Sequence, residues 1–332
     1  MDVQQFIDCW NSDSSTLTVH TSGSTGKPRP MEVEKSRMRA SAITTCRFLG
    51  LKKGDTALLC MPLEYIAGQM MVVRSIVGEL NLISVESSSH PMASLAGTTI
   101  DFAAMVPLQV VSTLQVESER KMLMAIRHLI IGGGAIDSML AAQLADFPNA
   151  VWSTYGMTET LSHIALRRLN GPERSEWYTP FGGAELSLTE EGCLMIDAPA
   201  ICSERLVTND IAELKDGRFR IIGRRDNVVC SGGLKIQIEE FEQLLKPHIP
   251  QPFMLTKAPH HALGQQLVML CEGETDVAGL DTLCRSLLPR HYHPQAIFSV
   301  EKLPLTATGK PARAAAEEMA KLLCVEKISS TL

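Results

Sequence analysis

Several features that would assign the sequence to a familiar class of protein are missing from it. The nine cysteines are scattered singly with no C-x-x-C pair, which argues against structural zinc and against a disulfide framework. No apolar run approaches the roughly 20 residues that span a membrane. The first ten residues, MDVQQFIDCW, are too polar for a signal peptide. We therefore expect a protein of a reducing compartment, located in the cytoplasm, without a membrane span.

An excess of positive charge is also missing. Lysine and arginine number 31 against 37 aspartate and glutamate, for a formal net charge of −6, and no basic run occurs. A nucleic-acid partner therefore has no electrostatic support. What the chain does have is 332 residues of which 45% are hydrophobic. That is enough for packed cores in one large or two smaller domains.

Two common nucleotide-binding patterns are not matched by the glycine-rich segments of the sequence either. A P-loop needs G-x-x-x-x-G-K-[ST], but Pro28 follows Lys27, and Thr21 stands where the first glycine belongs. The segment IGGGAI, residues 131–136, is a strand-to-helix turn but does not match the dinucleotide pattern G-x-G-x-x-G. The sequence therefore argues against both classes.

The first half of the chain alternates between strand and helix patterns. Residues 15–20, 55–62 and 81–86 are typical of short strands, residues 36–50 of a helix that ends at Gly50, and residues 127–147 of a strand, a tight turn and a helix. This alternation predicts a layered α/β domain with a largely parallel sheet.

The pattern changes after about residue 170. Turn signals at Glu191-Gly192 and Asp216-Gly217 separate alternating strands, which predicts the hairpins of a β-rich subdomain. Residues 237–250 are typical of a short acidic helix stopped by prolines. The best boundary lies near Arg225-Asp226, giving a large domain over residues 1–225 and a small α+β domain over residues 226–332.

The stretch HTSGSTGKPRP, residues 20–30, is the most informative segment. Its glycines let successive backbone N–H groups turn toward an anion, its hydroxyls add donors, and its lysine adds positive charge. The ordered string favours a phosphate-binding loop over a flexible surface loop. The candidate phosphate ligands are Thr21, Ser22, Gly23, Ser24, Thr25, Gly26 and Lys27.

Five segments in order resemble the motifs of the adenylate-forming superfamily, the acyl-CoA synthetases and their relatives. They are TSGSTGKPR (21–29), STYGMTET (153–160), VTNDIAEL (207–214), GRRDNVVCSGGLKIQIEEFE (223–242) and LPLTATGKPAR (303–313). Any one of them alone is a weak signal, but five in order across nearly the whole chain are very specific. The resemblance implies a layered adenylate-forming fold with a small mobile C-terminal domain.

The resemblance also implies a reaction. A carboxylate attacks the α-phosphate of ATP and releases pyrophosphate, and a thiol, usually coenzyme A, then attacks the acyl-adenylate. Glu159 would bind Mg²⁺, Thr158 the α-phosphate, and Lys310 the substrate carboxylate and ribose side during the first step. The remaining ATP contacts would come from Gly134, Tyr155, Gly156, Asp210 and Arg224.

Two further segments resemble o-succinylbenzoate–CoA ligases of menaquinone biosynthesis. MPLEYIAGQMMVVRSI (61–76) resembles their acyl-pocket segment, and MVPLQV (105–110) resembles their V-P-x-Q piece. Because that substrate has two carboxylates, one is adenylated and the other needs a basic partner. Arg74 falls where those enzymes place such an arginine, with Tyr65, Ser162 and His163 as additional pocket residues.

The second step would involve a rotation of the C-terminal domain about a hinge at Asp226. That rotation would bring Ser231, Gly232 and Gly233 to the site, where the pantetheine arm of coenzyme A passes. The chain has only about 20 residues before the phosphate loop, where the family typically has well over a hundred, so most of one N-terminal subdomain is expected to be missing. The apolar face that the subdomain would cover favours a homo-oligomer.

Each assignment has a structural alternative. Glu159 can simply begin a helix, Asp210 can serve a turn, and Lys310 can be a solvated loop lysine. Arg74 can be an exposed helix residue, although an unpaired arginine within the apolar run MMVVRSIV would be costly. Two other functions also stay open: a ligase for another aryl or acyl acid, and a nucleotide-binding regulatory protein that lost turnover.

Overall fold

A computed structural model describes residues 1–20, 30–306 and 311–329, and these pack into two units. Unit 1 comprises Met1–Thr189, Leu194–Thr208 and Leu214–Arg220. Unit 2 comprises Glu190–Cys193, Asn209–Glu213 and Ile221–Leu332.

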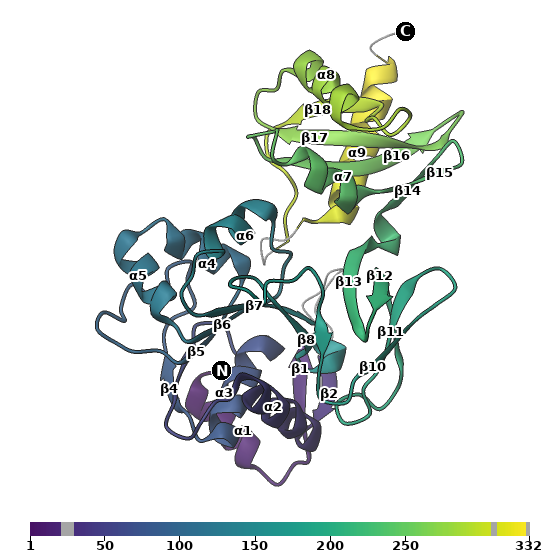
Figure 1. The fold of residues 1–332 in the computed structure, drawn as a ribbon. Coiled ribbons are helices and arrows are strands. Elements are labelled where there is room, and N and C mark those ends of the chain that lie inside the picture. The colour runs from purple at the N-terminus through teal and green to yellow at the C-terminus, as the bar shows by residue number, and fades with distance from the viewer. Residues whose placement is uncertain (21–29, 307–310, 330–332) are drawn as a thin grey trace. The chain divides into compact units, whose positions relative to one another are not determined.

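Unit 1 is built on a seven-stranded sheet with the order β4-β3-β5-β6-β7-β8-β9 (Figure 1). Its strands are β3 (Thr56–Leu59), β4 (Asn81–Ser84), β5 (Phe102–Met105), β6 (His128–Ile131), β7 (Ala150–Gly156), β8 (His163–Arg168) and β9 (Thr179–Pro180). Strands β4 to β7 pair in parallel, and β8 and β9 are added antiparallel. The expectation of a layered α/β domain with a largely parallel sheet is confirmed.

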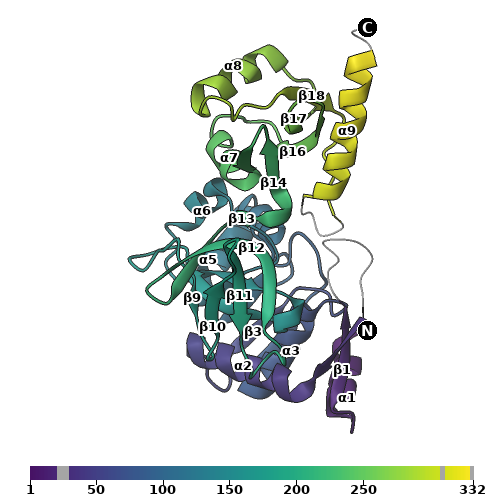
Figure 2. The ribbon, with the colours of Figure 1, turned by 90° about the vertical axis from the view of Figure 1, so that its right-hand side faces the viewer.

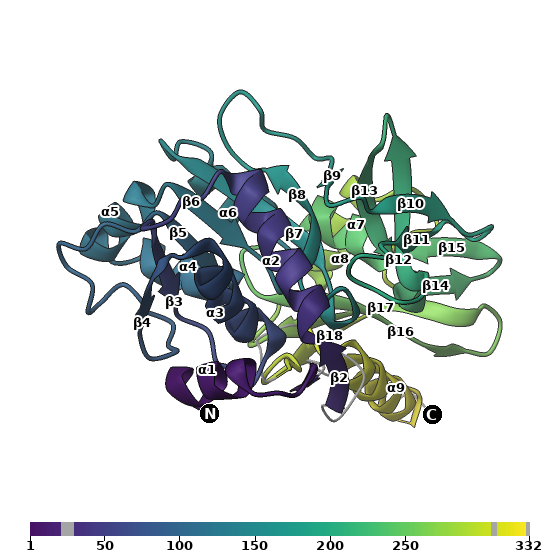
Figure 3. The ribbon, with the colours of Figure 1, turned by 90° about the horizontal axis from the view of Figure 1, so that it is seen from below.

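Helices cover both faces of this sheet. They are α1 (Val3–Asn11), α2 (Lys35–Leu49), α3 (Ile66–Gly78), α4 (Pro107–Leu114), α5 (Glu117–Ala125) and α6 (Ser138–Leu144). Helices α2 and α3 lie on one face and α4 to α6 on the other (Figures 1 and 3). Leu58, Ala103 and Leu129 point from adjacent strands into the core under α4 to α6. Their strand neighbours are buried on the opposite face, which explains why these strands are apolar throughout.

Two smaller β structures complete the first part of the chain. Strands β1 (Thr16–His20) and β2 (Pro30–Glu34) pair antiparallel, with His20 opposite Pro30. A four-stranded sheet has the order β10-β11-β12-β13, and its strands are β10 (Glu185–Leu188), β11 (Cys193–Asp197), β12 (Leu206–Lys215) and β13 (Arg218–Arg224). Asp216 and Gly217 both have positive φ, 51° and 71°, as a tight hairpin turn between β12 and β13 requires. The predicted β-rich segment is confirmed.

Unit 2 contains a five-stranded sheet with helices on both faces (Figure 2). Its strands are β14 (Val228–Ser231), β15 (Leu234–Gln237), β16 (Phe253–His260), β17 (Gly264–Glu272) and β18 (Ala296–Val300), and its helices are α7 (Ile238–Leu245), α8 (Val277–Leu287) and α9 (Arg313–Ser329). Leu255 and Met269 face the core under α7 and α8, while Met254 and Leu270 face the core under α9. Alternation along β16 and β17 thus builds two cores on one sheet.

The cysteine and membrane predictions can be compared with the fold. All nine cysteines lie in the described part of the chain, and all are free thiols. No helix within residues 1–20, 30–306 and 311–329 is long and apolar enough to cross a membrane.

Candidate active site

The parallel strands of unit 1 end at one edge of the sheet, where most of its predicted site residues lie. Strand β3 leads to Tyr65, which is the N-cap residue of α3, and β5 leads to Pro107 at the start of α4. Strand β6 leads to the glycine turn that contains the exposed Gly134, and β7 leads to Thr158 and Glu159. Loops at the carboxyl ends of parallel strands are the usual place for a ligand in this architecture.

The turn after β7 has a close backbone approach at Gly156. This residue pairs with His163 at a register shift between β7 and β8. A Cβ on Gly156 would lie 2.2 Å from the Ser162 carbonyl oxygen and 2.5 Å from the His163 Cα, so no other residue fits. The glycine of the matched segment STYGMTET is therefore required for steric reasons, independent of its predicted role at ATP.

Thr160 holds the same turn and was not singled out by the sequence pattern. Its fully buried hydroxyl accepts from the Met157 N–H at 2.9 Å and lies 2.6 Å from the Ser162 carbonyl. Leu161, between them, has φ +60°, an uncommon backbone conformation for leucine. Buried bonds therefore hold a strained turn in place beside the predicted substrate residues.

Thr158 and Glu159 lie in a short 3₁₀ turn and have different environments. Thr158 is buried, whereas Glu159 is exposed, and its carboxylate makes no hydrogen bond or ion pair with any residue in the described ranges. A group of three or more histidine, cysteine or acidic side chains able to hold a metal is absent from those ranges. A single accessible carboxylate fits Mg²⁺, which is usually held by one or two carboxylates together with waters and substrate phosphates.

Tyr155 is fixed by aromatic neighbours. Its ring lies 5.0 Å from the ring of Phe219 and 5.9 Å from that of Tyr178, while Tyr178 and Phe219 stack at 5.3 Å. The hydroxyl groups of Ser153 and Tyr178 are 2.8 Å apart. This cluster gives the Tyr155 ring a defined orientation at the end of β7.

Arg74 is the most unusual residue of unit 1. It lies on α3 and is only 2% exposed. One guanidinium nitrogen donates to the Ser162 hydroxyl, but Nε has no hydrogen-bond partner, and no carboxylate within the described residues forms an ion pair with it. Burial lowers the pKa of Arg74 to about 10. The alternative of an exposed helix residue is thus wrong, and the arginine is buried without a counter-ion among the residues that the structure describes.

His163 contacts the same Ser162 hydroxyl that accepts from Arg74. Its Nδ1 lies 3.3 Å from the Ser162 hydroxyl, and its Nε2 lies 3.1 Å from the Thr45 hydroxyl on α2. Burial, reinforced by the charge of Arg74, holds the pKa of His163 well below its ordinary value. The structure therefore brings together three of the four predicted acyl-pocket residues in one buried chain of hydrogen bonds.

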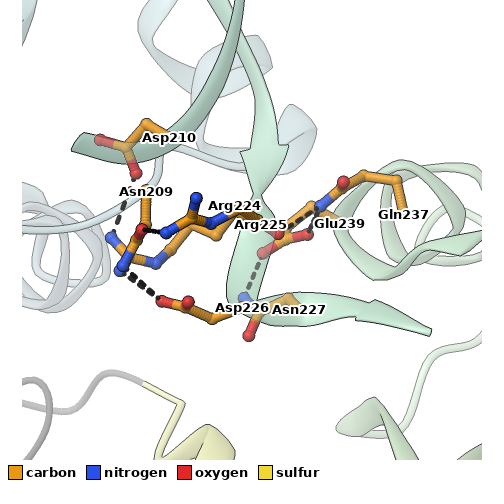
Figure 4. A network of polar contacts seen from close by, with 8 residues as sticks. All are labelled: Asn209, Asp210, Arg224, Arg225, Asp226, Asn227, Gln237 and Glu239. Atoms are coloured by element: carbon orange, nitrogen blue, oxygen red, sulfur yellow. Dashed lines mark hydrogen bonds and ion pairs between the residues drawn. The ribbon is translucent and has the colours of Figure 1, made fainter. Parts of the chain in front are cut away.

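A second group of predicted residues lies in unit 2 around the end of β13 (Figure 4). Arg224 donates to Asp210 at 3.1 Å and to Asp226 at 2.9 Å. Burial acts to lower the pKa of Arg224, but the carboxylates of Asp226 and Asp210 outweigh it and raise that pKa. Two predicted ATP contacts, Asp210 and Arg224, therefore form one network with the predicted hinge residue Asp226.

Asn209 enlarges this network and marks a departure from the family pattern. The T-G-D segment of the family has glycine where this chain has Asn209. Its amide donates to Asp226 at 3.2 Å, and its carbonyl accepts from Arg225 at 2.7 Å (Figure 4). Glycine has no side chain for either bond, so both contacts with the predicted hinge segment depend on the asparagine at this position.

The predicted coenzyme A residues form a tight turn in unit 2. Gly232 and Gly233 connect β14 to β15 with φ of +56° and +85°. The Gly232 N–H donates to the Leu263 carbonyl at 2.9 Å, and Ser231 is buried beside the turn. The positive φ values explain why two glycines are needed here.

Two residues of the matched motifs turn out to have a structural role that the sequence did not reveal. Arg313, the first residue of α9, forms a two-pronged ion pair with Glu242, with N···O distances of 2.7 Å and 2.6 Å. Arg313 also donates to the Leu255 carbonyl, and the Leu255 N–H donates back to Glu242. Glu242 and Arg313, the last residues of the fourth and fifth matched segments, are therefore ion-pair partners within unit 2.

The remaining predicted site residues lie outside the described part of the chain. They are Thr21, Ser22, Gly23, Ser24, Thr25, Gly26 and Lys27 of the phosphate loop, together with Lys310. Their roles stay predictions.

Comparisons with known proteins agree with the fold and with the motif order. A family model described as AMP-binding enzyme matches residues 4–192, more than half of the chain. Curated 2-succinylbenzoate–CoA ligases are similar over most of it: the Listeria monocytogenes serotype 4b protein is 24% identical, covering 92% of this chain and 70% of its own length. The Haemophilus influenzae protein is 28% identical, covering 84% and 66%. The chain is therefore shorter than these relatives.

Solved structures give a similar result. An acyl-CoA synthetase (AMP-forming)/AMP-acid ligase II-like protein from Dyadobacter fermentans is 35% identical, with a TM-score of 0.66, covering 94% of this chain and 92% of its own. The o-succinylbenzoate coenzyme A synthetase of Bacillus subtilis, solved with ATP and magnesium, shares the fold at 21% identity and a TM-score of 0.74. From the family match and the 35% identical relative we conclude that this chain belongs to the AMP-binding, adenylate-forming family of acyl-CoA ligases.

Proposed function

We propose that the protein is an ATP-dependent carboxylate–coenzyme A ligase whose acid is o-succinylbenzoate, the reaction used in menaquinone biosynthesis. The acid carboxylate attacks the α-phosphorus of ATP, and pyrophosphate leaves. The thiol of coenzyme A then loses its proton and attacks the acyl carbonyl, and AMP leaves as the thioester forms. The curated relatives at 24% and 28% identity carry this substrate in their names, which supports the choice of acid.

The choice of an acid with two carboxylates rests on Arg74, whose charge is buried without a counter-ion among the described residues. A guanidinium removed from water without a counter-ion is costly, and the cost is relieved when a carboxylate binds. An acid with a second carboxylate supplies such a partner in a planar arrangement that suits arginine. Neighbouring Ser162 and His163 cannot compensate the charge: the serine hydroxyl is neutral, and burial keeps the imidazole in its neutral form.

For the first step we assign the nucleotide contacts by the motif resemblance. The loop Ser22–Lys27 holds the β- and γ-phosphates, Thr158 the α-phosphate, and Asp210 the ribose hydroxyls. Glu159 is the ligand proposed for Mg²⁺, whose contribution is to neutralise phosphate charge as the two anions meet. The exposed, unpaired carboxylate of Glu159 is consistent with that role.

For the second step we propose the hinge at Asp226 and the coenzyme A contacts at Ser231, Gly232 and Gly233. Asp226 is exposed; its carboxylate accepts from the side chains of Arg224 and Asn209, and its backbone carbonyl accepts from Lys257. A rotation about Asp226 is expected to break these bonds, because its backbone angles would change relative to β12 and β13. The two glycines leave a narrow turn beside which a pantetheine arm can pass.

The test is pyrophosphate release with ATP, Mg²⁺ and o-succinylbenzoate, with and without coenzyme A. Release together with a coenzyme A thioester is the expected result. Release with benzoate or fatty acids but not with this acid would keep the ligase activity and overturn the choice of substrate. ATP binding without release from any acid would instead favour a nucleotide-binding regulatory protein.

Lys310 provides a prediction that separates the two half-reactions. Changing Lys310→Ala is expected to lower the rate of adenylate formation by about 10²–10³-fold, the effect of removing one charge-stabilising group from a transition state. Thioester formation from supplied acyl-adenylate is expected to stay near the wild-type rate. Single-turnover assays of each step provide the measurement, and full adenylation by the variant would remove Lys310 from the site.

A further inference from the structure

The buried chain of hydrogen bonds that starts at Arg74 contains one residue that no motif includes, Thr45 on helix α2. Thr45 is fully buried and lies 118 positions from His163 in the sequence, yet its hydroxyl is 3.1 Å from the His163 Nε2. The same hydroxyl lies 3.1 Å from the Ser41 backbone carbonyl, one helical turn earlier. All of these residues belong to unit 1.

The direction of every bond in this chain is fixed by its two ends. A guanidinium can only donate and a backbone carbonyl can only accept. Arg74 therefore donates to the Ser162 oxygen at one end, and Thr45 donates its single proton to the Ser41 carbonyl at the other. The Thr45 oxygen is then left with lone pairs only, and the hydrogen at its contact with His163 has to come from the imidazole.

This direction selects one tautomer of His163. The proton lies on Nε2, which donates to Thr45, and Nδ1 is left as an acceptor. The Ser162 hydroxyl donates its proton to that Nδ1 across 3.3 Å, so its lone pairs turn toward Arg74. Each contact in the chain then joins one donor to one acceptor, and the neutral imidazole adds no charge next to the guanidinium.

We propose that Thr45 is a positioning residue of the acyl site, which fixes His163 as the Nε2–H tautomer and through Ser162 holds the Arg74 guanidinium oriented for the second carboxylate of the substrate. The inference rests on the function proposed above. One side of the guanidinium is thereby anchored, while Nε stays without a partner among the described residues and can bind an acid. Thr45 acts through other residues and contacts no substrate.

The first arm of the test is kinetic and compares three variants. Thr45→Val keeps the shape but removes the hydroxyl. It is expected to raise KM for o-succinylbenzoate about tenfold, the equivalent of about 1.4 kcal/mol, with kcat and the KM for ATP unchanged. Thr45→Ser restores the hydroxyl and is expected to restore KM. Thr44→Val is the matched control, because Thr44 makes the same bond to the carbonyl four residues earlier, at 2.9 Å, without contacting His163.

The second arm reads the tautomer directly and needs no activity. In protein labelled with ¹⁵N-histidine, the His163 ring is expected to show a protonated Nε2 and a bare Nδ1, with His163→Gln identifying the signal. The Nε2–H preference is expected to be lost in Thr45→Val and kept in Thr44→Val.

The two measurements distinguish a failure of the proposal for Thr45 from a failure of the proposed function. A proton on Nδ1 in the unaltered protein would overturn the proposal whatever the activity, and so would an unchanged KM for o-succinylbenzoate in Thr45→Val. Absence of turnover with any dicarboxylic acid, together with the expected tautomer, would overturn the proposed function and with it the link to substrate. The hydrogen-bond direction itself would still stand.

Discussion

Replacing Arg74 by methionine is expected to make the protein more stable and at the same time far less active. Methionine is shorter than arginine but unbranched, flexible and uncharged, so it can fill most of the buried position on α3 without an uncompensated guanidinium. We expect the free energy of unfolding of the unliganded protein to rise by about 1–3 kcal/mol, because an unpaired charge is removed from the interior. The measurement is a melting or denaturant curve without substrate.

The same substitution removes the proposed partner of the second carboxylate. Loss of one member of a buried, hydrogen-bonded charge pair costs about 2–5 kcal/mol, so kcat/KM for o-succinylbenzoate is expected to fall roughly 10²–10³-fold. The control acid is 3-benzoylpropionate, which lacks the carboxylate on the ring. Its activity is expected to be the same in both proteins. A stable variant that still binds o-succinylbenzoate at the original KM would place Arg74 outside the pocket.

Breaking the ion pair between Arg313 and Glu242 is expected to cause the largest loss of stability in unit 2. The two side chains are 24% and 21% exposed and form two short bonds, and each also bonds to Leu255. Arg313→Met leaves the Glu242 carboxylate largely buried without its partner. We expect a cost of about 3 kcal/mol, the lower end of the range for a buried pair because this one keeps some contact with water.

The double variant Arg313→Met with Glu242→Met tests the origin of that loss. With both charges removed, most of the lost stability is expected to return, since the penalty comes from the unpaired carboxylate and not from the absent bond. Hydrogen exchange of peptides from β16 and α9 gives the measurement for unit 2 alone. Equal protection in the single variant and in the unaltered protein would show that the pair contributes little.

The sequence predicts the helices and strands of this protein better than it predicts which distant side chains contact one another. Strand and helix patterns between residues 15 and 147 are confirmed because each depends on the spacing of nearby apolar residues, as in the helix that ends at Gly50. Arg74 could be singled out because an arginine within an apolar run is unusual on its own. The short side chains around it carry no such signal.

The contacts that were missed join residues far apart in the chain. Glu242 and Arg313 lie 71 positions apart, and Thr45 and His163 lie 118 apart, and each belongs to a segment whose own pattern is satisfied without the partner. Thr160 could have been suspected, since it follows the matched glutamate directly. Its role depends on a strained backbone at Leu161, which no spacing of residues reveals.

The distribution of aromatic residues has a consequence for spectroscopy. All three tryptophans, Trp10, Trp152 and Trp177, lie in unit 1, and unit 2 has a single tyrosine, Tyr292, packed on Phe241. Tryptophan emission therefore follows the unfolding of unit 1 and is nearly blind to unit 2. An Arg313→Met protein would look intact in a fluorescence melt while circular dichroism records an earlier loss of helix and strand. Coincidence of the two signals in that variant would show instead that the units unfold together.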